Sequence, residues 1–320
     1  MAKNKQQKEK TFSRDPQPSC SLFSFARLFF AWNLFSVLCS FFLFGCYKPT
    51  PPITQLTDAH KKFEQTCRED FLITPVITSL PDTLYIYIPV RFDILRTKAS
   101  QQMLVKTDPS LKRQVNFVET DFADQEIAVR YDITEVMTYP KSLGYSSTYT
   151  EEFSRLHNNV LGALSRSFGD LDEDQRPMDF VVLSIVDVRN GIGIKNTFHF
   201  MDLKKAMAQA LPQDEYARRY LSEMIGDQNL IGNTTGRGLE RTDLTWPEFL
   251  AKQITYRINF KYNRSAFPPT DSDVNEIMRI VHDTLSAYDY TDVSTITLKD
   301  LASGETYRFD YSQLETFGEE

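Results

Sequence analysis

The hydrophobic and polar positions of this chain repeat one pattern three times. In each repeat, apolar residues first recur at the spacing of one helix face, and then alternate or run together as they do in two successive strands. The predicted helices cover residues 57–71, 149–168 and 270–288, and the strands after them cover 72–78 and 83–90, 180–188 and 192–200, and 293–299 and 305–311. The recurrence is one of element order and not of residue identity, so it indicates a repeated architecture without demonstrating a duplication.

The segments between these units carry weaker patterns. Alternation over 114–122 and 125–139 predicts a hairpin that turns at Ala123 and Asp124, after an irregular connection at 91–113. Further helices are expected at 203–211, 213–225 and 246–252, followed by a strand at 254–262. Helices interleaved with hairpins predict an α+β fold of mostly antiparallel sheets with helices on one face, arranged as a first module at 56–140 and a second at 141–320.

Local signals place several element boundaries. Thr148 with Glu151, and Thr270 with Asp273, have the spacing of residues that cap a helix N-terminus. The dipeptide Asn190-Gly191 between two apolar runs predicts a hairpin turn. In the strand at 83–90, aliphatic residues alternate with tyrosines, which is typical of a strand with both faces partly covered.

The longest apolar run stands apart from this pattern. Residues 28–45 contain no charged side chain and follow a basic segment that ends at Arg27. At roughly 1.5 Å per helical residue, the run reaches about 27 Å, just short of a hydrocarbon core of about 30 Å. A basic flank stays on the cytoplasmic side of a membrane, so residues 1–45 are predicted to be a signal peptide that exports the remainder of the chain.

The end of this run, Leu43-Phe44-Gly45-Cys46, resembles the lipobox of bacterial lipoproteins. The resemblance implies that Leu43 and Gly45 are read by the processing machinery, that the leader is cut before Cys46, and that Cys46 carries the lipid. Acylation by two or more fatty acids, of which palmitate is one, would give lasting attachment to a membrane. Residues 46–55 contain three prolines and would form a stiff tether.

Two features depart from the family pattern. Phe44 is bulkier than the residue usually found at its position, and the segment before the apolar run is unusually long. The alternative is an uncleaved signal anchor with Cys46 as an ordinary cysteine, which would place the folded body on the same side of the membrane. Tyr47, and not aspartate, follows Cys46; by the sorting rule of enteric bacteria this favours the outer membrane.

Composition limits the partners of the exported part. The whole chain has a net charge of −7 although its first 45 residues are basic, so the remainder is strongly acidic and is not suited to binding nucleic acid through phosphates. Once the leader is removed and Cys46 is lipidated, Cys67 is the remaining cysteine of the four. The body is therefore expected to have no internal disulfide. Cys67 falls on the apolar face of its helix, and we expect it to be buried.

Two loops were considered as ligand sites. Asp170, Asp172 and Asp174 have the initial spacing of a calcium loop, but Gln175 and Val181 replace its required glycine and glutamate. The segment Gly232-Asn-Thr-Thr-Gly236-Arg-Gly238 has the glycines to present backbone N–H groups to an anion, although it lacks the lysine of a phosphate loop. Its possible ligand residues are Gly232, Gly236, Arg237 and Gly238; a plain surface loop is the alternative.

Motifs for catalysis or metal binding are weak. His60, His157, His199 and His282 are scattered, and the chain has neither a zinc motif nor a nucleophile elbow. We therefore expect no metal and no cofactor, and we favour a non-catalytic role. The body also resembles uncharacterised bacterial lipoproteins in which a helix precedes a strand such as DTLYIYIPV; that resemblance implies no activity.

These observations predict a lipoprotein of the bacterial cell envelope, held to the membrane through Cys46, with its body in the periplasm or at the surface. It would have a binding or structural role toward an envelope protein partner. One alternative is an envelope hydrolase with a site built from dispersed His and Asp/Glu residues. Another is a small-ligand binding protein that uses the Gly232–Gly238 loop and has a concave, positively lined site at Arg237 and Arg241.

Overall fold

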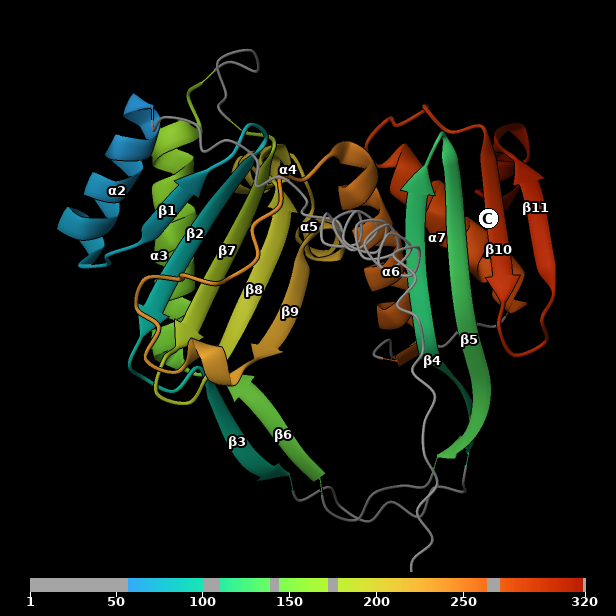
Figure 1. Cartoon of the computed structure of the whole chain (residues 1–320), viewed down its shortest axis with the longest axis horizontal. Helices are drawn as coiled ribbons and strands as arrows, with labels where there is room; N and C mark the ends of the chain where they lie inside the picture. The colour runs from blue at the N-terminus through green and yellow to red at the C-terminus, as the bar shows by residue number, and fades with distance from the viewer. Residues whose placement is uncertain (1–56, 101–109, 139–143, 172–177, 264–270, 319–320) are drawn as a thin grey trace, which may run out of the picture. The chain divides into compact units, whose positions relative to one another are not determined.

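The fold is α+β, as the sequence predicts (Figure 1). The computed structural model describes residues 57–100, 110–138, 144–171, 178–263 and 271–318. Within these ranges the strands form two main sheets and one two-stranded ribbon. The predicted leader, Cys46 with its lipobox, and the tether lie outside the described residues, as does most of the acidic 170–175 segment. None of the helices in the described ranges has the length and hydropathy needed to cross a bilayer.

The first sheet joins the first two helix–strand–strand units. Its strand order is β1-β2-β7-β8-β9, in which β2 and β7 run parallel and the other neighbours run antiparallel. A helix on the chain between β2 and β7 makes this parallel pairing possible. The elements are α2 (Asp58–Phe71), β1 (Val76–Ser79), β2 (Thr83–Val90), α3 (Glu151–Phe168), β7 (Phe180–Asp187), β8 (Ile192–His199) and β9 (Leu221–Gly226).

The second sheet is assembled by the same scheme. Its order is β11-β10-β5-β4, with β5 and β10 parallel at the centre and an antiparallel hairpin partner on each side. Two helices precede β10 and pack against this sheet. The elements are β4 (Ser110–Ala123), β5 (Glu126–Thr138), α6 (Trp246–Asn263), α7 (Asp273–Ser286), β10 (Thr295–Asp300), β11 (Thr306–Asp310) and the terminal 3-10 helix η3 (Tyr311–Phe317).

The β4–β5 hairpin is inserted between β2 and α3 of the first sheet. The chain leaves the first sheet through β3 (Leu95–Ser100) and comes back through β6 (Gly144–Tyr149), which pairs with β3 to form the ribbon. The β2–β7 and β5–β10 pairings both cross the module boundary that was predicted at residue 140. Neither predicted module therefore contains a complete sheet, and the described residues belong to one compact unit.

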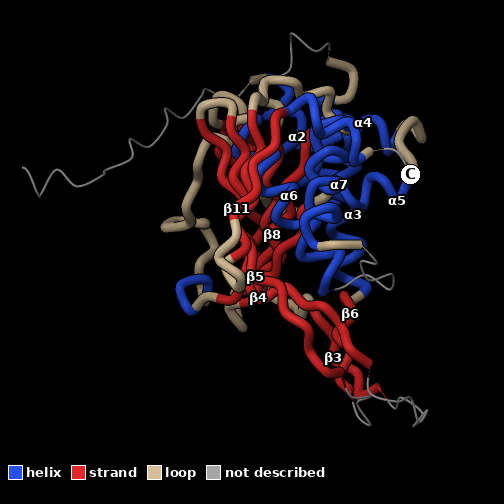
Figure 2. Tube along the Cα trace, turned by 90° about the vertical axis from the view of Figure 1, so that its right-hand side faces the viewer, coloured by secondary structure: helices blue, strands red, loops and turns tan. Residues whose placement is uncertain are grey.

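Helices α2 and α3 cover one side of the first sheet, and α6 and α7 cover one side of the second (Figure 2). Under the first sheet, α2 and α3 bury a core that includes Phe63, Phe153, Phe168 and the inward residues of β2 and β7. A separate core under the second sheet joins residues of α6 and α7 to β5 and β10. Cys67 is fully buried in the first core, as predicted.

Two predicted elements were wrong. Residues 254–262 continue helix α6 and do not form a strand. Ile254, Ile258 and Tyr262 are spaced by four residues, which fits a helix face and a strand face equally, and all three are fully buried against the second core. The predicted helix at 213–225 ends early: α5 covers Gln213–Arg219, and the next residues form β9 because they pair with the edge of β8.

Several element boundaries also differ from the predicted ones. Helix α3 is capped by Thr150 and not Thr148, and α7 is capped by Ser272 and not Thr270. In each case the observed cap lies directly before the first helical residue, where its side-chain oxygen accepts a backbone N–H. The expected irregular connection at 91–113 contains β3 and the beginning of β4, and the helix expected at 203–211 is α4, Phe200–Met207.

Candidate functional site

The face of the first sheet that points away from α2 and α3 carries a row of side chains from three strands. Tyr87 of β2 lies opposite Ser184 of β7, and Ser184 lies opposite Lys195 of β8. Successive strand residues point to opposite faces, so these three share one face. This second face is also buried, because every residue of β7 is buried, including those that point away from α2 and α3.

A long connection covers this face. We call residues 227–245 the covering loop; it begins after β9, contains the 3-10 helix η2 (Gln228–Leu230) and leads into α6. The Tyr85 hydroxyl donates to the Thr242 carbonyl (2.8 Å) and accepts from the Thr242 N–H (3.1 Å). The Tyr87 hydroxyl donates to the Asn233 carbonyl at 2.5 Å. The two tyrosines of β2 therefore fasten two points of the loop to the sheet.

Further contacts fasten the end of the covering loop. The Leu244 N–H donates to the fully buried Thr83 Oγ1 at 2.8 Å. The Asp82 N–H donates to Asp243 Oδ1 at 3.0 Å. These hydrogen bonds hold the loop against the strand. The polar groups that make them are satisfied within the protein and do not need water as a partner.

One glycine of the loop fits the sheet closely. Gly236 is buried with a φ of +64°, and a Cβ placed there would lie 3.0 Å from the Tyr87 ring. A side chain at this position would be strained by the positive φ and would also press against the Tyr87 ring. Gly232 has a similar φ of +70° but faces open space. Gly236 therefore sets how closely the loop approaches β2.

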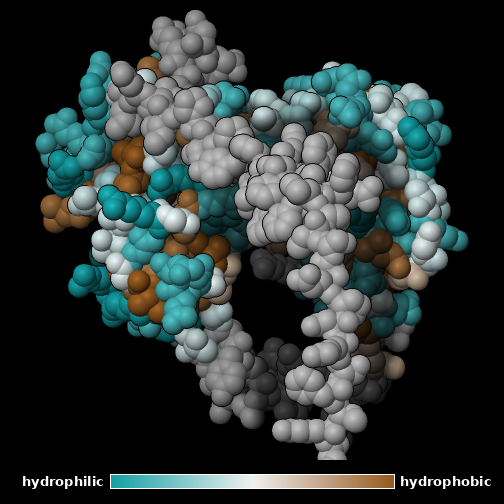
Figure 3. Space-filling view, viewed as in Figure 1, coloured by the Kyte–Doolittle hydropathy of each residue, from teal (hydrophilic) through white to brown (hydrophobic). Residues whose placement is uncertain are grey.

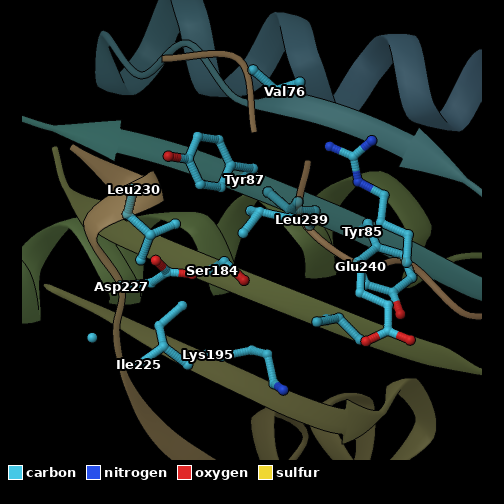
Figure 4. Close-up of a pocket in the computed structure, with 14 residues that line it drawn as sticks. Val76, Tyr85, Tyr87, Ser184, Lys195, Ile225, Asp227, Leu230, Leu239 and Glu240 are labelled. Atoms are coloured by element: carbon cyan, nitrogen blue, oxygen red, sulfur yellow. The ribbon is translucent and has the colours of Figure 1, made fainter. Parts of the chain in front are cut away.

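Between the covering loop and the sheet lies a cavity of about 340 Å³ (Figure 4). Tyr87, Ile225 and Leu230 gather toward one end, Tyr85 and Glu240 lie toward the other, and Ser184 and Leu239 lie between them. Its volume is at the small end of the roughly 300–1,000 Å³ of ligand pockets. The lining also includes Val76, Ile86, Val182, Lys195, Gly226, Asp227 and Arg241.

Charged groups of both signs line this cavity. Lys195 Nζ lies 2.7 Å from Glu223, which is outside the lining. Arg241 Nη2 donates to the Gly236 carbonyl at 3.0 Å, and Asp227 Oδ1 accepts the Asn229 N–H at 2.8 Å. Burial raises the pKa of Tyr85, although its backbone hydrogen bond and the nearby Lys195 ammonium act in the opposite direction. The Tyr85 hydroxyl therefore stays protonated and able to donate.

The predicted ligand segment is part of the covering loop, but none of its four predicted ligand residues lines the cavity. Arg241 lines the cavity and Gly236 packs against the Tyr87 ring, whereas Gly232, Arg237 and Gly238 are exposed and outside the lining. The expectation of a positively lined site was wrong, because Asp227 and Glu240 accompany the two cations. Sequence reasoning missed Tyr85, Tyr87 and Lys195. The signal was present, since β2 was expected to be covered on both faces, but alternation alone does not tell which face carries a cavity.

Apolar side chains also gather on the surface near this site. On the face drawn in Figure 3, brown atoms interrupt the hydrophilic surface over the first sheet. Around the β8–β9 end, Met224 is 60% exposed and Ile231 is 53% exposed. Single exposed apolar residues are ordinary in folded proteins, so we assign no role to them.

The histidines of the predicted hydrolase site do not come together. His60 completes a capping box with Thr57, and His157 is hydrogen-bonded to the Tyr220 hydroxyl at 2.6 Å. His282 lies beside Asp283 at the surface. His199 Nδ1 lies 3.9 Å from Asp202 Oδ2. Three of the four are thus accounted for as caps, packing or surface contacts, each on a different element.

The surroundings of Asp202 are those of a structural ion cluster. This buried carboxylate accepts from the Tyr288 hydroxyl (2.9 Å) and from Arg219 Nη1 (3.3 Å). Arg219 also donates to the Ala287 carbonyl, so the cluster ties α4 and α5 to the end of α7. Burial raises the pKa of Asp202, and the bonds to Tyr288 and Arg219 oppose that rise. Its groups satisfy one another, and no lining residue of the cavity belongs to it.

Nucleophile and metal chemistry find little support in the described part of the chain. Burial raises the pKa of the Cys67 thiol to about 12, which keeps it protonated and unreactive. Among the described residues, no three His, Cys, Asp or Glu side chains are grouped so that they could hold a metal ion. Comparison with models of protein families, with curated proteins and with solved structures found no match.

Proposed function

We propose that this protein is a membrane-tethered binding protein of the bacterial envelope, and that it binds a small ligand in the cavity beneath the covering loop. The observation that carries the proposal is the cavity of about 340 Å³, built on the face of a rigid sheet. Sites of this kind combine an apolar lining with a few placed polar groups, and here Val76, Ile225 and Leu230 accompany Ser184 and the charged residues.

The way the site is constructed supports binding. In the first sheet, side chains from β2, β7 and β8 are fixed by strand pairing, and the covering loop is fastened to β2 at several points. A site that exists before the ligand arrives avoids much of the entropy cost of ordering loops on binding. The arrangement is therefore suited to holding a ligand.

The tether is supported by sequence alone. The apolar run 28–45, the basic segment before it and the Leu43–Cys46 motif are the features that an exported lipoprotein needs. We infer that Cys46 carries the lipid and that the acidic body extends from the membrane on the proline-containing segment 46–55. The envelope protein partner expected from the sequence stays a prediction.

The binding proposal is tested by native mass spectrometry of the full chain, extracted from its membrane in mild detergent. We expect a non-covalent small-molecule adduct on the wild-type protein. Ser184→Trp places a large side chain in the centre of the cavity and should remove the adduct. Thr297→Val, on the second sheet, is the matched control and should keep it. An adduct that persists unchanged in Ser184→Trp would place binding elsewhere.

The tether is tested separately by fractionation and lipid labelling. We expect wild-type protein to incorporate labelled palmitate and to sediment with membranes. Cys46→Ser should lose the label and leave the precursor uncut. Cys67→Ser serves as the control, because Cys67 is buried in the folded core and should not affect labelling. Unchanged labelling in Cys46→Ser would refute lipidation at this residue.

A further inference from the structure

The floor and the rim of the cavity differ in charge. The charged lining residues are all accessible to some degree, since Asp227 and Glu240 are exposed. Lys195 and Arg241 are half-buried. The lining residues that are buried, which form the floor, carry no charge; they are Ile86, Tyr87, Val182, Ser184 and Leu230. A ligand that enters the cavity therefore passes a charged rim and meets an uncharged floor.

The half-buried cations of the rim already have partners within the protein. Lys195 Nζ lies 2.7 Å from Glu223, and Arg241 Nη2 donates to the Gly236 carbonyl at 3.0 Å. The two carboxylates of the rim are exposed to water, which weakens any ion pair that they could make with a ligand. The described lining thus holds no buried, unpaired charge that an ionic group of a ligand could neutralise.

One polar group of the floor lacks a partner. Ser184 is 8% exposed, and none of the described residues forms a hydrogen bond with its hydroxyl. Figure 4 shows Ser184 between the two ends of the cavity, as is Leu239 of the covering loop. Buried polar groups in folded proteins nearly always have a hydrogen-bond partner. The free hydroxyl therefore points to a group that binds in the cavity and supplies one hydrogen bond.

The size of the cavity limits the rest of the ligand. At roughly 30 Å³ for each water-sized group, a volume of about 340 Å³ holds about ten non-hydrogen atoms. The side chains of Val76, Leu230 and Leu239 line this space. Most of the ligand atoms must therefore be apolar, with the polar group placed against Ser184.

From these observations we propose that the ligand is an electrically neutral molecule of this size, with an apolar body and one carbonyl or hydroxyl group. The body contacts Val76, Leu230 and Leu239, and the polar group forms a hydrogen bond with Ser184. Carboxylates, phosphates and amines of the same size are excluded, because each would bury an ionic group without a partner. This identification rests on the proposed binding function and narrows it to one chemical class.

The proposal is tested with three small molecules that share a cyclohexane ring and differ in one group. At pH 7, cyclohexanecarboxamide is neutral, cyclohexanecarboxylate is an anion and cyclohexylmethylamine is a cation. Saturation-transfer NMR of the full chain in mild detergent measures each affinity, and Ser184→Trp supplies the blank for binding to detergent. We expect the carboxamide to bind at least about tenfold more tightly than either ion. An ion that binds as tightly as the carboxamide would overturn the assignment.

The variant Ser184→Ala locates the polar group of the ligand. It removes the hydroxyl and leaves the cavity open, so it should weaken carboxamide binding about fivefold, the effect of losing one neutral hydrogen bond. Thr297→Val removes a hydroxyl from the second sheet and is the matched control, which should alter no affinity. Carboxamide binding that is unchanged in Ser184→Ala would overturn the contact with Ser184 and the assignment with it.

The stability of Ser184→Ala gives a readout that needs no ligand. In protein freed of its adduct by dialysis, the variant removes a buried hydroxyl that has no partner. It should therefore unfold at the same urea concentration as the wild type or at a higher one. A lower midpoint would show that the hydroxyl is bonded within the protein, and the assignment would fail.

The outcomes separate this inference from the proposed function. If the native adduct is lost in Ser184→Trp but proves to be an acid or an amine, the neutral class fails and the binding site stands. If the adduct persists in Ser184→Trp, both fail. A neutral adduct, together with the preference for the carboxamide and its weaker binding to Ser184→Ala, would establish the ligand class.

Discussion

The two main sheets share a plan but differ in what covers their second face. Each has a parallel central pair flanked by hairpin partners, and each packs helices on one side. In the first sheet, β7 is buried throughout, because the covering loop and the beginning of α6 lie over the other side. In the second sheet, buried residues of β5 such as Ile127 and Val129 alternate with accessible ones such as Ala128 and Arg130.

The uncovered face of the second sheet carries a group of charged side chains. Arg130 on β5 lies 3.0 Å from Glu119 and 2.7 Å from Asp121 on β4, with all three exposed to solvent. Exposed pairs of this kind contribute little to stability. The shared helix–strand–strand scheme thus supplies a scaffold, and on the first sheet a cavity forms where the covering loop encloses the second face.

The hairpin turns of the two sheets show how closely the plan is repeated. Asp187 and Gly191 at the β7–β8 turn correspond to Asp300 and Gly304 at the β10–β11 turn. In both turns the glycine has a positive φ and its N–H donates to the aspartate carbonyl, at 2.9 Å and 3.0 Å. A side-chain oxygen of each aspartate also accepts a backbone N–H two residues later. The matching spacing in the sequence thus reflects one local structure.

The largest difference between the sheets should appear when a charge is placed on each second face. Val182→Lys puts an ammonium group among Phe180, Leu221 and Phe249, and should cost more than about 4 kcal/mol. Ala128→Lys lies opposite Asp121 on the accessible face and should change stability by no more than about 0.5 kcal/mol. Urea denaturation of both variants measures this. Equal costs would mean that the two faces are equally buried.

A smaller difference is expected from removing one hydroxyl from each sheet. Thr83→Val leaves the buried Leu244 N–H without its acceptor and should cost about 1–3 kcal/mol. Thr297→Val in the second sheet removes a bond to the carboxylate of Glu126, where water can replace it, and should cost less than about 1 kcal/mol. Hydrogen exchange at Leu244 should increase in Thr83→Val only. Protection that is unchanged there would show that the loop does not depend on this bond.

The close approach of the covering loop is tested by two glycines with similar backbone angles. Gly236→Ala and Gly232→Ala both pay the cost of a positive φ, roughly 1–2 kcal/mol. Only Gly236→Ala also presses a methyl group on Tyr87, so it should cost about 1 kcal/mol more. Thermal unfolding compares the pair. If Gly232→Ala is the more destabilising, the loop is not held against β2 as described.

The smallest expected effect is on how stability depends on pH, through Asp187 at the β7–β8 turn of the first sheet. Burial alone would raise the pKa of Asp187, but the combined hydrogen bonds from Arg189 and Asn190 outweigh it and lower the pKa. A lowered pKa contributes stability above the usual value near 3.8, and this contribution is lost as pH falls through the lowered pKa. Asp187→Asn should therefore narrow the difference in urea midpoint between pH 7 and pH 3. An unchanged difference would assign the acid sensitivity to other carboxylates.

Much of the fold could be read from local pattern. The three helix–strand–strand units, the Ala123–Asp124 hairpin and the burial of Cys67 all follow from spacing within short windows. Pairing between distant strands could not be read in this way, because the parallel register of β2 with β7 leaves no mark on either strand alone. The pairing of the β4–β5 hairpin with β10 was not predicted for that reason. The prediction divided α6 into a helix and a strand, because residues spaced by four positions fit one face of a helix and one face of a strand equally well.

The site was only partly predictable. The predicted ligand residues between 232 and 238 do not line the cavity, whereas Arg241, which was expected beside them, does. The floor of the cavity was not foreseen, since Tyr85, Ser184 and Lys195 become neighbours only through strand pairing. Their sequence signal is the same as that of any strand buried on two sides, so chemistry on that face is visible only after the sheet is assembled.

The insertion of β4 and β5 has a consequence for the order in which the protein can mature. A chain emerging from its amino end can complete the first sheet once Gly226 has appeared, whereas the hairpin at 110–138 must wait for β10 at 295–300. During that interval the inner edge of β5 lacks its parallel neighbour, and unpaired strand edges invite association between nascent copies. Shielding of this edge during synthesis would therefore limit such association.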